Sequence, residues 1–214
     1  MTGDASAGSP RTVTTPDGRT LACLEVGDLR GPLVLHNHGG PSSRLEARLF
    51  AAAAAKNGIR LVCVDRPGIG RSSRQKTRSY AGWAADLTAI ADALGCHEFG
   101  VTGWSEGGPW ALAAAAHIDS RRLRHVSSIA GGSYGTFGDN WAADRLSKAD
   151  AMGGTLALRF TPGFRLMYAV LGLTAKRYRR AYMDQLRKAV NGYDREILQR
   201  PEIAAAFSDT SAEC

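Results

Sequence analysis

The stretch of this chain that decides its fold reads Val101-Thr102-Gly103-Trp104-Ser105-Glu106-Gly107-Gly108-Pro109. It joins a strand-like run to an alanine-rich run of helical composition, and Ser105 occupies the turn between them. On such a sharp turn a serine hydroxyl projects outward, and glycine two residues before and after it lets strand and helix approach closely. The stretch therefore predicts a strand–turn–helix in which Gly103 and Gly107 frame a nucleophilic serine.

Strand-like and helix-like runs alternate on both sides of this turn. Two extended runs, 11–15 and 20–26, flank the turn sequence Pro16-Asp17-Gly18-Arg19, which predicts an antiparallel hairpin. The later runs predict strands at 33–36, 59–64, 98–102 and 125–130, and helices at 45–56, 80–94 and 106–117. Such alternation predicts an α/β fold, with a mostly parallel sheet that helices cover on both faces.

The composition changes near Gly131. Beyond this point strand-like runs largely disappear, and the chain predicts helices at 141–151, 166–173 and 176–190, separated by glycines. We therefore expect a core domain at 11–131 and a helical cap region at 132–214.

The overall composition is that of a globular protein. A chain of 214 residues is long enough for one hydrophobic core, and 44% hydrophobic with 22% charged residues is an ordinary balance. The formal net charge of +7 is modest. The densest basic cluster is typical of a solvated helix face and comprises Lys176, Arg177, Arg179 and Arg180. Nucleic acid is therefore not an expected partner.

The cysteines and the N-terminal segment bear on location. Cys23, Cys63 and Cys96 lie in or beside apolar runs. The spacings among the cysteines, Cys214 included, do not resemble those of a metal site or a disulfide framework. This pattern predicts buried, reduced thiols. The N-terminal residues lack the apolar segment of a secretory signal, and no apolar run reaches the roughly 18 residues of a membrane span. We expect a cytoplasmic protein without a membrane span.

Two further loops follow predicted strands. His36-Asn37-His38-Gly39-Gly40-Pro41 follows one buried strand, and Asp65-Arg66-Pro67-Gly68-Ile69-Gly70-Arg71-Ser72-Ser73 follows the next. Open α/β sheets bind ligands at the carboxyl ends of their strands, so both loops would lie near Ser105. Acyl transfer through a serine needs two N–H donors for the developing oxyanion, which the first loop's glycines and Glu106 would supply. His38 is expected to shape its loop rather than to catalyse.

Taken together, the three motifs resemble the α/β-hydrolase superfamily, in the branch with a His-Gly-Gly-Pro loop and a Gly-x-Ser-x-Gly-Gly elbow. The order and spacing match over roughly residues 11–130. The resemblance implies a hydrolase of an ester or related carbonyl substrate that needs no metal or cofactor. It implies these site residues: the nucleophile Ser105, the oxyanion N–H groups of Gly40 and Glu106, and the supporting residues His38, Gly39, Gly103 and Gly107.

The residue at the elbow narrows the class of enzyme. Epoxide hydrolases and haloalkane dehalogenases of this superfamily use a carboxylate there, so Ser105 argues against both branches. Esterases, proline-iminopeptidase-like enzymes, carbon–carbon bond hydrolases and cofactor-free haloperoxidases stay open.

A base and an acid for Ser105 are harder to find. His117 lies twelve residues further along the same predicted helix, about 18 Å away at about 1.5 Å per residue. His125 opens the next strand at the opposite end of the sheet. The carboxylates after the elbow are expected at the surface: Asp139, Asp184, Asp194 and Asp209.

The family's chain order is serine, then acid, then histidine, the last two after strands seven and eight. We therefore expect the acid and the base beyond residue 214, and this chain to be the front part of a longer enzyme. Without strands seven and eight, the run 125–130 would be an exposed sheet edge, which invites self-association.

The cap region is rich in aromatic residues, namely Tyr134, Phe137, Trp141, Phe160, Phe164, Tyr168, Tyr178 and Tyr182. Placed above Ser105, they would favour a small-molecule substrate with an apolar group. At helical spacing, aromatic side chains more often pack a cap onto its core, and that interpretation stays open.

Two other classes of function stay open. A non-catalytic remnant of the fold would keep the cleft but lack the base. A nucleotide-binding α/β protein is suggested by the glycine loops, but Gly68-Ile69-Gly70 lacks the third glycine of the dinucleotide fingerprint, and no P-loop Gly-Lys-Ser/Thr occurs.

Overall fold

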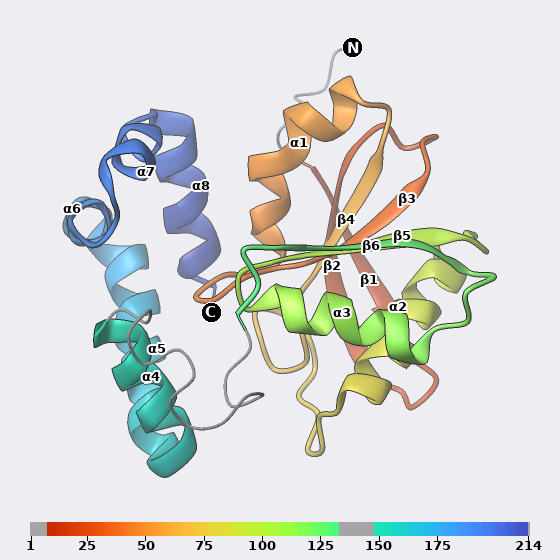
Figure 1. Cartoon of the computed structure of the whole chain (residues 1–214), viewed down its shortest axis with the longest axis horizontal. Coiled ribbons are helices and arrows are strands. Elements are labelled where there is room, and N and C mark those ends of the chain that lie inside the picture. The colour runs from red at the N-terminus through yellow and green to blue at the C-terminus, as the bar shows by residue number, and fades with distance from the viewer. Residues whose placement is uncertain (1–7, 133–147, 214) are drawn as a thin grey trace.

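A computed structural model describes residues 8–132 and 148–213 of the chain. Its six strands form one sheet of order β1-β2-β4-β3-β5-β6 (Figure 1). The strands are β1 Ser9–Thr14, β2 Thr20–Gly27, β3 Leu33–Asn37, β4 Arg60–Val64, β5 Phe99–Trp104 and β6 Leu123–Ile129. β1 and β2 form the predicted antiparallel hairpin, β2 is antiparallel to β4, and the four remaining strands are parallel. The predicted α/β fold is confirmed.

Helices cover both faces of the sheet (Figure 1). The short helix η1 (Arg44–Glu46) leads into α1 (Ala47–Lys56), whose buried alanines pack against β2 and β4 on one face. On the other face lie α2 (Tyr80–Ala93) and α3 (Gly107–His117). Trp83, Leu87 and Ile90 of α2 form the larger hydrophobic core with strand residues and with α3. The strand-like and helix-like patterns of the sequence therefore account for a core of three layers, one sheet between two layers of helices.

The sheet topology explains where a site can form. β3 and β5 are parallel neighbours, but β3 leads to α1 on one face and β5 leads to α3 on the other. In α/β proteins such a reversal marks the place, at the carboxyl ends of the two strands, where ligands bind. The loop that starts at His38 and the turn that holds Ser105 both follow these strand ends.

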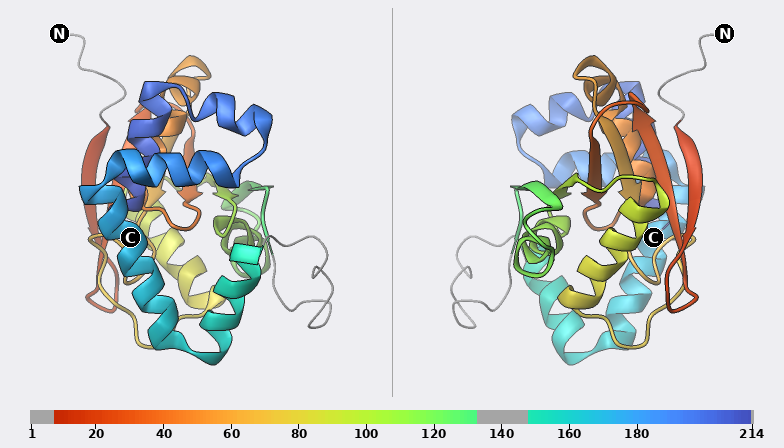
Figure 2. Two further views of the ribbon diagram at one scale, coloured as in Figure 1. Left: turned by 90° about the vertical axis from the view of Figure 1, so that its left-hand side faces the viewer. Right: turned by 90° about the vertical axis from the view of Figure 1, so that its right-hand side faces the viewer.

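Five helices follow the sheet: α4 Lys148–Arg159, α5 Thr161–Arg177, α6 Arg179–Ala189, α7 Gly192–Ile197 and α8 Pro201–Ser211. They gather on one side of the sheet, facing the viewer in the left panel of Figure 2. The predicted helix 166–173 lies within α5. The predicted helix 176–190 was wrong at its start, because α5 continues to Arg177 and α6 begins at Arg179.

Most of the predicted helix 141–151 falls outside the described residues, as does the segment that follows the expected domain boundary at 131–132. That boundary stays a prediction. The helices α7 and α8 were not predicted. Among the described residues, no helix is both long and apolar enough to cross a membrane.

The described cysteines are free thiols. Burial raises the pKa of the Cys23 thiol to about 12 and raises that of Cys63 well above its usual range. Cys96 is only half-buried, because it lies in the turn after α2, so its predicted full burial was wrong. Cys214 falls outside the described residues.

Candidate active site

Ser105 sits on a sharp turn between β5 and α3. Its φ of 52° lies in the left-handed region that residues other than glycine seldom adopt. The turn is held by two backbone hydrogen bonds, from the Ser105 N–H to the Ile129 carbonyl and from the Gly108 N–H to the Ser105 carbonyl, each of 2.9 Å. A strained, half-buried serine at the end of β5 is the backbone arrangement that a nucleophile elbow requires.

The glycines around Ser105 allow this turn to form. A Cβ atom on Gly103 would lie 2.2 Å from the Gly107 carbonyl oxygen, and one on Gly107 would lie 2.1 Å from the Asn37 carbonyl oxygen. Any side chain would therefore push the strand away from the helix or the elbow away from β3. This is the close approach that the sequence pattern predicts.

The loop after β3 packs directly against the elbow. A Cβ atom on Gly39 would lie 3.3 Å from the Ser105 Cβ. The Gly39 N–H donates to Oε2 of the buried Glu46 at 3.1 Å, and Glu46 Oε1 lies 2.7 Å from Nε2 of the buried His36. The Glu46 carboxylate thus fixes the peptide group that faces Ser105.

His38 is buried and hydrogen-bonded at both ring nitrogens. Its Nδ1–H donates to the Gly39 carbonyl at 2.8 Å, and its Nε2 accepts from the Arg66 N–H at 3.4 Å. Burial and the neighbouring Arg66 guanidinium hold the pKa of His38 well below its usual value of 6.5. A neutral imidazole with both nitrogens engaged holds the loop in place and is not free to act as a base.

The loop after β4 is tied to the same region by Asp65. This buried carboxylate accepts from the Arg44 N–H at 2.6 Å, from the Arg44 guanidinium at 2.8 Å and from the Arg71 N–H at 2.9 Å. Burial raises the pKa of Asp65, although Arg44 and the two N–H groups oppose the shift. The Arg66 guanidinium also donates to the Gly39 carbonyl at 3.2 Å.

The sequence did not predict a role for Arg44 or Glu46, or the ion pair between Asp65 and Arg44. The available signal was a charged pair, Arg44 and Glu46, at the start of an alanine-rich helix that is otherwise apolar on its buried face.

The backbone N–H groups of Gly40 and Glu106 are the expected oxyanion donors. Within residues 8–132 and 148–213, neither the Gly40 N–H nor the Glu106 N–H donates a hydrogen bond. Glu106 immediately precedes α3, so its N–H belongs to the group of N-terminal donors that a helix leaves without partners. Its carboxylate lies against the Gly40 backbone and accepts from the Tyr168 hydroxyl of α5 at 3.1 Å.

The Ser105 hydroxyl has no hydrogen-bond partner among the described residues. His125 is paired with Gly100 near the start of β5, at the end of the strand away from Ser105. Asp184 and Asp194 lie in α6 and α7, and Asp209 forms ion pairs with Arg48 and Arg179. Asp139 falls outside the described residues.

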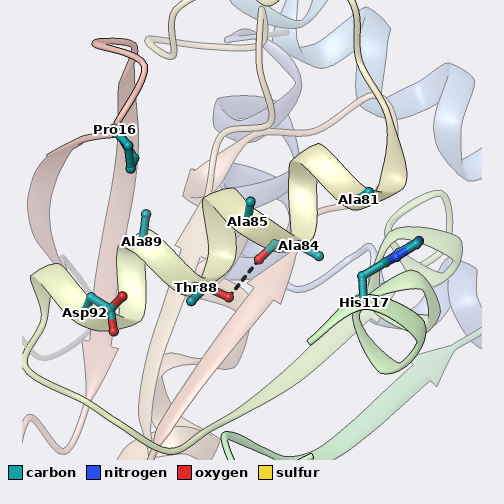
Figure 3. Close-up of a pocket in the computed structure, with 8 residues that line it drawn as sticks. All are labelled: Pro16, Ala81, Ala84, Ala85, Thr88, Ala89, Asp92 and His117. Atoms are coloured by element: carbon teal, nitrogen blue, oxygen red, sulfur yellow. Dashed lines mark hydrogen bonds between the residues drawn. The ribbon is translucent and has the colours of Figure 1, made fainter. Parts of the chain in front are cut away.

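His117 ends α3 and lies in a surface hollow of about 330 Å³ (Figure 3). The figure shows this hollow along α2, where it is lined mainly by alanines together with Pro16, Thr88 and Asp92. The hollow does not include Ser105. The structure thus brings together Ser105, Gly39, Gly40 and Glu106, but not His117 or His125.

The aromatic residues of the expected cap differ in their contacts and in their exposure. Tyr168 contacts the elbow through Glu106, and its ring lies 4.7 Å from that of Phe164. Tyr182 is buried against α8, whereas Phe160 and Tyr178 are exposed. Tyr134, Phe137 and Trp141 fall outside the described residues. The packing interpretation therefore holds for Tyr182, whereas Tyr168 contacts Glu106 beside Ser105.

Comparisons with known proteins identify the fold family. The family model described as alpha/beta hydrolase fold matches residues 32–209, most of the chain, so this protein belongs to the α/β-hydrolase fold family. A solved alpha/beta hydrolase fold protein from Nakamurella multipartita is 26% identical with a TM-score of 0.56, over 94% of this chain and 68% of that one.

Curated relatives match over shorter stretches. Epoxide hydrolase B of Mycobacterium tuberculosis is 35% identical over 91 residues, 40% of this chain and 26% of that protein. The uncharacterized hydrolase YcgS of Bacillus subtilis is 31% identical over 107 residues, 50% of this chain and 37% of that protein. The match therefore spans only 26% and 37% of the length of these relatives.

Proposed function

We propose that this protein is a serine hydrolase that acts on an ester or a related carbonyl substrate through Ser105. The observation that carries the proposal is the elbow itself: Ser105 at φ 52°, with Gly39 against it. The two unused N–H groups, of Gly40 and Glu106, support an oxyanion hole, because donors aimed at a developing charge stabilise the transition state most.

In this reaction the Ser105 oxygen attacks the substrate carbonyl carbon, and the hydroxyl proton passes to a base. The carbonyl oxygen becomes an oxyanion on the Gly40 and Glu106 N–H groups. Collapse expels the leaving group, which takes up a proton, and water then hydrolyses the acyl-enzyme. We propose that neither His117 nor His125 is the base, because neither is placed near Ser105.

One curated relative is named an epoxide hydrolase, but a serine at position 105 argues against epoxide opening by this protein. A carboxylate that opens an epoxide forms an ester, which water hydrolyses. A serine would form an ether, which has no carbonyl carbon for water to attack, so the enzyme would not be regenerated. The residue at position 105 therefore supports acyl transfer.

The substrate is proposed to be a small molecule with an apolar group. Aromatic rings lie near the elbow: Trp104, next to Ser105, meets Phe207 edge to face at 5.7 Å, and Phe164 packs beside Tyr168, whose hydroxyl donates to Glu106. Apolar walls with a few polar groups are typical of small-molecule sites.

A fluorophosphonate probe tests the nucleophile. We expect it to label the protein encoded by the whole reading frame, and Ser105→Ala to abolish the label because the reacting oxygen is removed. Ser127→Ala, a substitution in the exposed part of β6, is the matched control and should keep it. Mass spectrometry locates the adduct, and undiminished labelling of the Ser105→Ala variant would exclude this nucleophile.

A non-catalytic fold remnant is the second candidate, favoured by the Ser105 hydroxyl having no partner among the described residues. It predicts that the well-folded 214-residue chain and the whole reading frame both lack serine-dependent ester turnover. Turnover that Ser105→Ala removes would reject it.

A further inference from the structure

The last helix of the structure, α8, presents hydroxyl groups to the loop that carries Gly39 and Gly40. Ser211 donates to the Pro41 carbonyl at 3.0 Å, and the Thr210 Oγ1 accepts from the Ser43 N–H at 2.9 Å. Thr210 and Ser211 are almost fully buried. Helix docking usually relies on apolar contact, so a buried hydroxyl surface at this place calls for a specific explanation.

Thr210 is hydrogen-bonded to both serines of the loop. Ser42 Oγ donates to Glu46 Oε2 at 2.6 Å, because a carboxylate only accepts. The Thr210 Oγ1 lies 2.9 Å from the Ser42 oxygen and 3.2 Å from the Ser43 carbonyl oxygen, and these two acceptors share its one proton. The same carboxylate oxygen of Glu46 accepts from the Gly39 N–H at 3.1 Å. A continuous chain therefore joins Thr210, Ser42, Glu46 and Gly39.

Each member of this chain is buried: Thr210 is 1% exposed, Ser42 5% and Glu46 0%. Chains of buried hydrogen bonds strengthen one another, and a buried polar group that loses its partner is costly. Without the Thr210 hydroxyl, the Ser42 oxygen, the Ser43 N–H and the Ser43 carbonyl each lose a hydrogen-bond partner. The position of Glu46, and with it the Gly39 peptide, would then be less well defined.

We propose that Thr210 is a positioning residue: through Ser42 and Glu46 it fixes the Gly39 N–H, and so places Gly39 and the following Gly40 against Ser105, so that α8 positions this loop. The consequence for catalysis rests on the proposed function, since it assumes that the Gly40 N–H serves the oxyanion. The consequence for the loop does not depend on any activity.

The test compares Thr210→Val, which removes the hydroxyl at equal size, with Thr210→Ser, which keeps it. Ser208→Ala is the matched control, because Ser208 is equally buried in α8 but donates to the Ala175 carbonyl of α5 at 2.9 Å. Ser42→Ala cuts the same chain without changing α8, and so keeps the proposal testable if Thr210→Val does not fold.

Hydrogen–deuterium exchange of the 214-residue chain is the first readout. The Gly39 amide does not contact Thr210, yet it should exchange about tenfold faster in Thr210→Val and in Ser42→Ala. Thr210→Ser should restore the protection, and Ser208→Ala should leave it unchanged. Unchanged protection in folded Thr210→Val or Ser42→Ala, no rescue by serine, or an equal effect of Ser208→Ala would each overturn the proposal.

The rate of fluorophosphonate labelling of Ser105, in the whole reading frame, is the second readout. It should fall about tenfold in Thr210→Val and recover in Thr210→Ser, because loss of an oxyanion donor slows attack. Labelling that is unaffected in Thr210→Val would overturn the catalytic part of the proposal. Absence of labelling in the unmodified protein would count against the proposed function, while the exchange result would still decide the positioning role.

Discussion

At the scale of the residue, His38 links a titrating side chain to the stability of the fold. Both of its ring nitrogens are engaged in the neutral form, and burial holds its pKa well below 6.5. The unfolded chain therefore binds a proton at a pH at which the folded chain does not. The stability that depends on neutral His38 is fully present above the unfolded pKa and is lost as the pH falls toward the folded one.

We expect the free energy of unfolding to decrease more in the unmodified chain than in His38→Gln when the pH drops from about 6.5 to about 5.5. The difference should be about 1 kcal/mol, since one bound proton changes stability by about 1.4 kcal/mol per pH unit. Urea unfolding at both pH values measures it. His117→Gln, which removes an exposed histidine, should behave like the unmodified chain. Equal decreases in all three proteins would contradict this account.

At the scale of the element, α8 shows why a helix can be missed in a sequence. Pro201 in its first turn, Glu202 behind it and the apolar Ile203 and Phe207 are helix signals. The run Ser208-Asp209-Thr210-Ser211 is typical of a turn, because short polar side chains compete for backbone hydrogen bonds. In the folded chain these hydroxyls find partners on α5, α6 and the Pro41 loop, and the helix continues to Ser211.

The helices α5 and α6 share a small core with Leu198 at the end of α7, formed around Ala175, Tyr182 and Met183, and Ile203 and Phe207 of α8 pack against it. Met183→Ala should lower the free energy of unfolding by about 2–5 kcal/mol, because it leaves a cavity in this core. Met152→Ala is the matched control, since Met152 is 56% exposed, and it should change stability by less than about 0.5 kcal/mol. Chemical denaturation measures both, and similar losses would show that this core does not exist as described.

At the scale of the whole molecule, β6 ends the sheet among the described strands. Arg124, His125, Ser127 and Ser128 of β6 are exposed, and Ile129 is 49% exposed. An unpaired strand edge offers hydrogen-bonding groups to another chain. Self-association of the 214-residue chain thus stays a prediction, and the exposed β6 is the strand through which we expect it.

We expect the average mass of the 214-residue chain to rise with protein concentration in analytical ultracentrifugation. Ile129→Lys should suppress the rise, because a charge on an edge strand opposes pairing. Leu112→Lys, at an equally exposed apolar site on α3, should leave it unchanged. If both lysine variants suppress association to the same extent, the contact does not run through β6.

Much of the core was predictable because its signals are local. The hairpin, the alternating strands and helices and the glycine-framed turn at Ser105 each depend on residues close together in the sequence. The helices α4 to α8 were less predictable. Glycines within α4 and the polar end of α8 conflict with helix propensity, and tertiary contacts outweigh that conflict in α8.

The sequence by itself determined the elbow. Ser105 requires Gly103 and Gly107, because any Cβ atom there would collide with backbone only a few residues away or on the neighbouring strand. Only the tertiary structure decided what holds the loop opposite Ser105. Glu46, Asp65 and Thr210 act through buried hydrogen bonds, and Thr210 meets Ser42 across 168 residues of sequence. No local pattern encodes such a contact, since it exists only once the sheet, α1 and α8 have packed together.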